Sequence, residues 1–116
     1  MPDYNRAEYM TSYVPLAVEL AIRPWGDSLE DADQYFLSGT CHVVHRGRQT
    51  LPEGAAWLPS LFDWLELLEQ AGHSAIAIEN VGDSGWLVYP VGDRDDSGAG
   101  QTREIALARL WRQVTR

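Results

Sequence analysis

The sharpest candidate for chemistry is a run of oxygen-bearing side chains in the last third of the chain. Asp93, Asp95 and Ser97 are spaced two apart, Gly98 follows them, and Glu104 is the twelfth residue counted from Asp93. Calcium loops place oxygen ligands at the first, third, fifth and twelfth positions and a glycine at the sixth. The spacing therefore predicts a calcium site in which Glu104, in the first turn of a following helix, is the last ligand.

Other features of the same run favour a solvated turn. The segment before Asp93 ends in Tyr89-Pro90-Val91, which is typical of a strand, whereas calcium loops of this type follow a helix. Gly100 stands where an apolar residue normally pins the loop, and no second loop pairs with this one. In this interpretation Glu104 complements a helix N-terminus. We expect no bound metal and no cofactor.

Cys41, His42 and His45 are the other candidates for metal or thiol chemistry. Alternation along a strand puts Cys41 and His45 on one face and His42 on the other. Two ligands are too few for a structural zinc site, and no base or orienting group accompanies the thiol. The chain has no lysine, no glycine-rich phosphate loop and no Gly-x-Ser-x-Gly elbow. These patterns predict a protein that is not an enzyme.

The charge balance indicates the kind of partner. Seventeen acidic residues face nine arginines, a net charge of −8 in 116 residues. Such a field repels nucleic-acid phosphates and anionic membranes and attracts basic protein surfaces. Two stretches are rich in acidic residues, the first over residues 27–33 and the second over residues 93–96. Trp25, in a Pro-Trp-Gly turn beside the first stretch, is either an exposed anchor for a partner or a core residue. The candidate partner-binding residues are Trp25, Asp27, Glu30, Asp31, Asp33, Asp93, Asp95 and Asp96. The alternative is that both stretches serve only solubility.

Length and composition predict one domain over residues 1–116, with residues 1–12 as a loose arm or an edge segment. Cys41 is the only cysteine, so no internal disulfide can form, which suits a reducing compartment. The chain shows no signal-peptide pattern, and no run approaches the roughly 20 apolar residues that span a bilayer. We expect a cytoplasmic protein of a host cell, without membrane contact.

The elements that must position these residues follow from hydrophobic periodicity. Residues 14–23 alternate strictly and predict a strand, and residues 40–45 predict another. Residues 27–37 are either a helix opened by Ser28 or an acidic loop running into a strand from Tyr35.

The second half of the chain is better defined. A helix begins near Pro59 and ends at Gly72, with Leu61, Leu65 and Leu68 on an apolar stripe that Phe62 and Trp64 widen. Residues 74–81 and 86–91 predict a hairpin around a turn at 82–85. A last helix is capped by Thr102, with Ile105, Ala108 and Trp111 on its buried face. The expected fold class is α+β, mainly one antiparallel sheet with two or three helices packed on it.

From Leu58 onward, over residues 58–114, the chain resembles phage proteins described as helix–strand–strand–helix (ABA) sandwich domains. The resemblance is carried by Trp64, by Gly85-Trp86 and by the closing pattern from Thr102 through Ala106 and Ala108 to Trp111. It implies a phage-encoded accessory protein without a catalytic site. In size and composition alone, the chain also resembles anti-CRISPR and other anti-defence proteins.

The expected function is that of a non-enzymatic inhibitor. Its acidic surface would block the nucleic-acid-binding site of a basic host protein, such as a CRISPR–Cas component, without binding nucleic acid itself. One alternative is an immunity protein that neutralises a toxin. Calcium binding and a structural role in a phage particle are the others.

Overall fold

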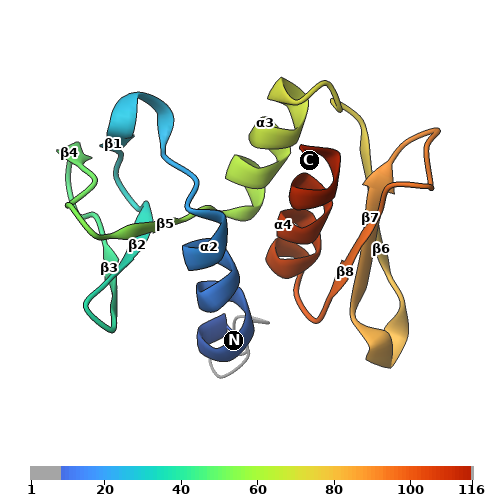
Figure 1. The fold of residues 1–116 in the computed structure, drawn as a ribbon, viewed down its shortest axis with the longest axis horizontal. Helices are drawn as coiled ribbons and strands as arrows, with labels where there is room; N and C mark the ends of the chain where they lie inside the picture. Colours follow the sequence, from blue (N-terminus) through green and yellow to red (C-terminus); the bar gives the residue numbers. More distant parts are fainter. Residues whose placement is uncertain (1–8, 116) are drawn as a thin grey trace.

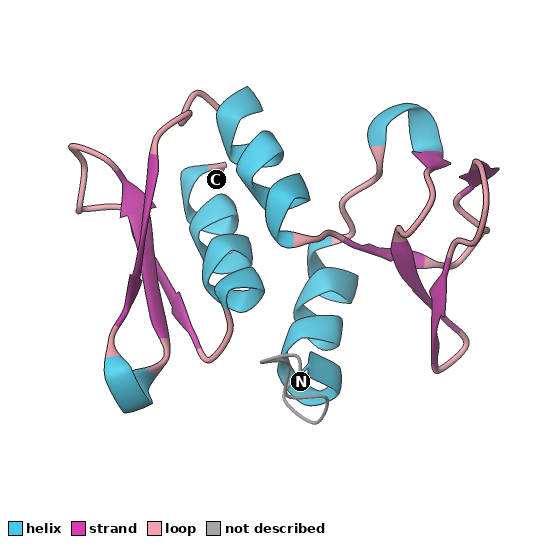
Figure 2. Ribbon diagram, turned by 180° about the vertical axis from the view of Figure 1, so that it is seen from behind, coloured by secondary structure: helices cyan, strands magenta, loops and turns pink. Residues whose placement is uncertain are grey.

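The computed structural model describes residues 9–115 of the chain, and this part forms an α+β fold (Figure 1). It has three α-helices and eight short strands, and every strand pair is antiparallel. The predicted fold class is confirmed, but the strands divide into three sheets where the periodicity predicted one. Figure 2 shows the helices as a central layer with strands on both sides.

The first regular element is a helix, so the predicted strand over residues 14–23 is wrong. A π-helical turn at Tyr9–Tyr13 leads into α2, Val14–Leu20. Tyr13, Leu16, Ala17 and Leu20 recur at the helical spacing of three, four and seven residues, and all of them pack into the main core. Pro15 stands at the start of the helix, where its missing N–H removes no helical hydrogen bond.

The same turn bears on the predicted arm at residues 1–12. Residues 9–12 belong to the helical turn before α2, and Met10 packs against the main core. This part of the arm prediction is therefore wrong. Residues 1–8 lie outside the described part of the chain.

Residues 22–58 form an N-terminal lobe of short strands. It contains the turn η2, Trp25–Asp27, then β1, Ser28–Leu29, and β2, Gln34–Leu37. It continues with β3, Thr40–Val43, β4, Gln49–Thr50, and β5, Ala56–Leu58. β1 pairs with β4, and β2 lies between β3 and β5. The acidic loop leading to a strand is thus the correct alternative for residues 27–37. Leu29, Val44, Leu51 and Trp57 form the small core of this lobe.

The helix α3, Leu61–Gln70, opens the C-terminal lobe. Its N-cap is Ser60, one residue after Pro59, and Ser60 and Asp63 form a reciprocal capping box. Trp64 and Leu68 are fully buried, as the stripe predicts, but Phe62 is 77% exposed because it lies off the stripe. The helix ends at the predicted place, with Ala71 as the C-cap.

The rest of the C-terminal lobe is a three-stranded sheet covered by a helix. β6, Ile76–Asn80, and β7, Trp86–Pro90, form the predicted hairpin, and β8, Gly98–Gly100, adds a short strand beside β7. The turn between β6 and β7 is the 3-10 turn η3, Gly82–Ser84. The helix α4, Arg103–Val114, is capped by Thr102 as predicted and lies on β7 and β8.

A buried hydrogen-bond chain joins the helices into one core. The Trp64 indole N–H on α3 donates to the Tyr13 hydroxyl at 2.8 Å, and that hydroxyl donates to the Pro59 carbonyl. Trp64 also lies against Trp111 of α4, with ring centroids 6.2 Å apart. The start of α2 is thereby fixed against α3. Among residues 9–115, no helix is long and apolar enough to cross a membrane.

Candidate functional site

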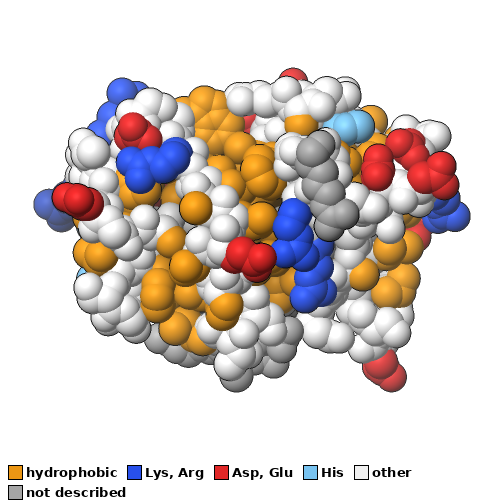
Figure 3. All heavy atoms as spheres, viewed as in Figure 1, with side chains coloured by type: hydrophobic (Ala, Val, Ile, Leu, Met, Phe, Trp, Pro, Cys, Tyr) orange, Lys and Arg blue, Asp and Glu red, His pale blue; other side chains and the backbone are white. Residues whose placement is uncertain are grey.

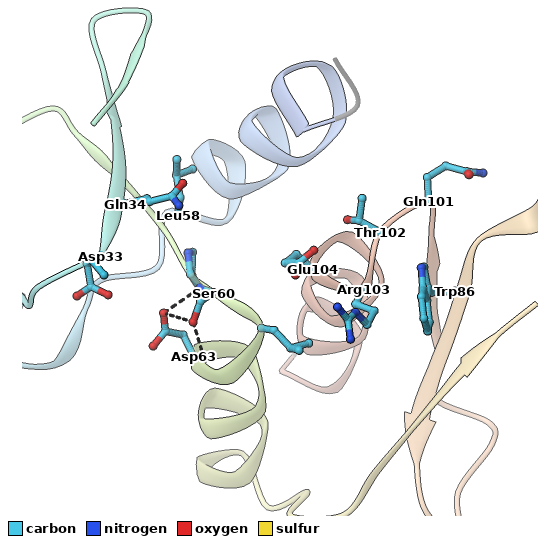
Figure 4. A pocket seen from close by; sticks show the side chains of 13 residues that line it. Asp33, Gln34, Leu58, Ser60, Asp63, Trp86, Gln101, Thr102, Arg103 and Glu104 are labelled. Carbon is cyan, nitrogen blue, oxygen red and sulfur yellow. Dashed lines mark hydrogen bonds between the residues drawn. The ribbon is translucent and has the colours of Figure 1, made fainter. Parts of the chain in front are cut away.

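Two hollows meet beside the N-terminus of α3. The larger, of about 600 Å³, lies between the lobes and is called here the inter-lobe cleft. Figure 4 shows Asp33 and Asp63 on one side of it and Arg103 and Glu104 on the other. The Arg103 guanidinium lies 5.2 Å from the centre of the Trp86 ring, at the far end of the cleft.

The smaller hollow, of about 290 Å³, is called here the aromatic–acidic groove. Besides Arg48 and smaller residues, two indoles and four carboxylates line it: Trp25, Trp57, Glu30, Asp33, Asp63 and Glu66. Asp33 and Asp63 also line the inter-lobe cleft. Groove and cleft are thus parts of one depression that has these two carboxylates at its centre.

Asp33 is held in place by the turn that precedes β2. The Glu30 backbone N–H donates to its carboxylate at 2.7 Å, and the Val44 N–H donates to its backbone carbonyl at 2.9 Å. Burial raises the pKa of Asp33 above its ordinary 3.8, although the hydrogen bond from Glu30 opposes the rise. Repulsion from Asp63 and Glu30 raises it further. The ionised carboxylates therefore repel one another at this point.

Asp63 is placed by the start of α3. The Ser60 backbone N–H donates to the Asp63 carboxylate at 2.8 Å, and the Asp63 N–H donates to the Ser60 hydroxyl oxygen at 3.2 Å. Glu66 is one turn further along the helix and is exposed. The helix thus presents two carboxylates to the depression from a backbone fixed by its cap.

Trp25 is neither fully exposed nor a core residue. It is 39% exposed and packs edge-on against Trp57, with ring centroids 5.6 Å apart and planes at 88°. Trp57 is 2% exposed, and its indole N–H has no hydrogen-bond partner among the described residues. Together the two rings form an apolar wall beside the carboxylates.

The other acidic residues of the first stretch make local contacts. Asp27 pairs with Arg23 at 2.8 Å, and the Asp31 carboxylate accepts a hydrogen bond from the Arg46 backbone N–H at 2.8 Å. Glu30 pairs with Arg48 at 3.3 Å, and both side chains are largely exposed. Exposed pairs of this kind contribute little to stability. Asp27 and Asp31 therefore shape the loop, whereas Glu30 and Asp33 face the groove.

The second acidic stretch lies at the opposite end of the molecule. Asp93, Asp95 and Asp96 occupy the loop between β7 and β8, far from β1 along the longest dimension of 38 Å (Figure 1). Arg94 lies among them, 4.5 Å from the centre of the Tyr89 ring. Its guanidinium donates to the Tyr89 hydroxyl at 2.8 Å, and this hydrogen bond raises the pKa of Arg94. The two acidic stretches do not form one surface.

Figure 3 shows one face of the protein. Acidic side chains lie towards both ends of this face and also beside basic side chains in its middle, where hydrophobic side chains occupy much of the surface.

The calcium loop is not assembled. The Ser97 N–H donates to the Gln113 side chain near the end of α4, whereas Glu104 lies in the first turn of that helix, about 13 Å away along its axis. Packing against α4 explains why residue 98 is a glycine, because a Cβ there would lie 2.1 Å from the Ala106 carbonyl oxygen. Over residues 9–115, no three His, Cys, Asp or Glu side chains gather closely enough to hold a metal ion.

Comparison with known proteins gives no match. No family model matches the chain, and no curated protein or solved structure is significantly similar to it.

Two carboxylates and two indoles of the depression are among the lining residues that the sequence did not suggest as candidates. Ser60 and Asp63 form a Ser-x-x-Asp pattern, which is a capping signal that fixes the start of the helix. The same helix start sets the direction of the Asp63 carboxylate and of the Glu66 carboxylate one turn later. Trp57 and Trp86 carry no such local signal. They line the site because the two lobes come together around α3.

Proposed function

We propose that this chain is a non-enzymatic binding protein that blocks a basic site on another protein. The partner would be a nucleic-acid-handling host protein, such as a component of a CRISPR–Cas or other defence system, and the chain would be a phage-encoded inhibitor. Carboxylates would occupy the positions that phosphates take in the partner's own complex. Contact centres on the aromatic–acidic groove and the adjoining inter-lobe cleft.

The observation that carries this proposal is the pair of carboxylates shared by groove and cleft. Asp33 and Asp63 are held by backbone hydrogen bonds, yet their charges repel each other and Asp33 is partly desolvated. Such an arrangement costs stability in the free protein. A guanidinium or ammonium group from a partner would offset the repulsion, so the site favours a cationic guest.

Two further features support binding. Partly exposed Trp25 stands beside the carboxylates, and aromatic residues next to desolvated charges are typical of interface hot spots. The net charge of −8 favours encounter with basic proteins over nucleic acid.

Affinity capture from host lysate tests the proposal. Immobilised wild-type protein should retain one or a few basic proteins, and retention should weaken with salt because the contact is electrostatic. Nucleic acid should compete for the captured protein. The double variant Glu30→Gln/Glu66→Gln, which neutralises two exposed carboxylates of the groove, should reduce retention about tenfold or more.

Glu69→Gln is the matched control. Glu69 is exposed on the same helix and does not line the groove, so its substitution changes the charge and leaves the site intact. Retention that ignores salt, or that falls equally in the control and in the double variant, would overturn the proposal.

A further inference from the structure

Trp57, which lines the groove, carries a buried hydrogen-bond donor that has no partner among the described residues. The donor is its indole Nε1–H, and the residue is 2% exposed. Buried donors are nearly always paired in folded proteins, and a buried indole N–H usually finds a partner. This N–H therefore marks a position where a bound group with an oxygen acceptor would complete the structure.

The carboxylates of the groove favour a cationic group, which differs from the oxygen acceptor that the Trp57 N–H favours. Among residues 9–115, the guanidinium that lines the groove with Glu30, Asp33, Asp63 and Glu66 is that of Arg48, which pairs with Glu30 across an exposed contact. The groove is thus left with an excess of negative charge. The neighbouring indoles favour a cation with an apolar stem or a planar face, as in lysine and arginine.

Few ligands offer both groups together. A metal ion or a polyamine supplies positive charge but no oxygen acceptor for the Trp57 N–H. The folded strands or helices of a basic domain use their backbone carbonyls in their own hydrogen bonds. An extended polypeptide supplies both, because each residue carries a free carbonyl and some carry a cationic side chain.

The shape of the depression also suits a chain. Asp33 and Asp63 join the groove to the inter-lobe cleft, where Glu104 adds a further carboxylate opposite them. The two hollows, of about 600 Å³ and about 290 Å³, share these two residues in their lining. A second cationic side chain of the same segment would therefore meet carboxylates in the cleft.

We infer that the occupant of this depression is an extended basic segment of a partner protein, seated with an arginine side chain in the groove and a backbone carbonyl on the Trp57 N–H. The inference rests on the proposed function and specifies its partner. The indole nitrogen is covered in the free protein, so the segment must displace a neighbouring side chain. Trp25 packs on Trp57 and is already 39% exposed, so we assign this movement to Trp25.

The test uses a short, fluorescently labelled glycine–serine peptide that carries two arginines. The same peptide with citrulline in place of arginine keeps the shape and removes the charge. We expect the arginine peptide to bind at least about tenfold more tightly than the citrulline peptide. Trp57→Phe, which removes the N–H and keeps an aromatic ring, should weaken arginine-peptide binding about tenfold and leave spermine binding unchanged.

A spectroscopic readout avoids dependence on the variant's folding. In the wild-type protein, the indole N–H resonance of Trp57 should move downfield when the arginine peptide is added, because it gains an acceptor. If that resonance stays in place while the peptide binds, the carbonyl contact is wrong. If the peptides fail to bind while the basic protein captured from lysate still does, the extended segment is wrong and the proposed function stands. If neither binds, both fail.

Discussion

Asp33 stabilises a local turn, yet its surroundings in the folded protein disfavour its ionised form. Its carboxylate closes a turn by accepting the Glu30 N–H at 2.7 Å, yet it is partly withdrawn from water and faces Asp63. Ionisation of Asp33 is therefore less favourable in the folded chain than in the unfolded chain, which is why its pKa rises. A cation bound in the groove would reverse this effect.

The raised pKa of Asp33 has a consequence for stability. In the window just above pH 3.8, the folded state keeps a proton on Asp33 that the unfolded state has lost, so this group's contribution to stability falls as the pH rises. Asp33→Asn keeps an oxygen acceptor for the Glu30 N–H and removes the charge. The Tm of this variant minus that of the wild type should become more positive between roughly pH 3 and pH 7.

Asp83→Asn is the control for this measurement. Asp83 is exposed in the turn between β6 and β7, away from the groove. Its Tm difference from the wild type should vary less with pH than that of Asp33→Asn. A difference for Asp33→Asn that is flat, or that declines as the pH rises, would show that Asp33 is not destabilised by ionisation.

At the scale of elements, α2 shows how two periodicities can occupy one segment. Val14, Leu16 and Val18 alternate like a strand, but Tyr13, Leu16, Ala17 and Leu20 follow a helical spacing. Pro15 fits either the start of a strand or the first turn of a helix. The tertiary contacts of Tyr13 decide between them, and its hydrogen bonds reach partners 46 and 51 residues away along the chain.

The buried hydroxyl of Tyr13 should therefore matter more than its size suggests. Tyr13→Phe leaves the Trp64 indole N–H and the Pro59 carbonyl without this partner in the core between α2 and α3. We expect a loss of about 1–3 kcal/mol in the free energy of unfolding, measured by urea denaturation. Tyr35→Phe removes a hydroxyl whose bond to Gln49 is long and exposed, and it should change stability by less than about 0.5 kcal/mol. Equal losses in the two variants would argue against a special role for the buried hydroxyl.

Elements with a local signal were predictable from the sequence, and those defined by distant contacts were not. Gly82–Gly85 marks the β6–β7 hairpin, and Thr102 marks the start of α4, because each depends only on neighbouring residues. The two-residue strands β1 and β4 exist only as each other's partners. For the same reason, the acidic residues within 27–33 could be predicted as a candidate contact from the sequence. Their position beside Asp63 and Glu66 in one groove could not be predicted, because it depends on distant contacts.

At the scale of the whole molecule, the position of the charges decides more than their sum. The groove lies between the two lobes, and the acids of the β7–β8 loop lie at the far end of a molecule 38 Å long. Charges in water are screened over about 8 Å at physiological ionic strength and over about 30 Å at 0.01 M. The distant loop can therefore attract a basic partner only when salt is low, whereas the groove acts at both salt concentrations.

This difference can be measured by stopped-flow association of the arginine peptide. The double variant Asp95→Asn/Asp96→Asn should slow association about twofold at 0.01 M salt and leave it unchanged at about 0.15 M. The reason is that the β7–β8 loop acts on the peptide through long-range attraction alone. Glu30→Gln/Glu66→Gln removes the same amount of charge within the groove and should weaken binding in both conditions. Equal effects of the two double variants at physiological salt would mean that the loop between β7 and β8 touches the partner directly, and contact would then extend beyond the depression between the lobes.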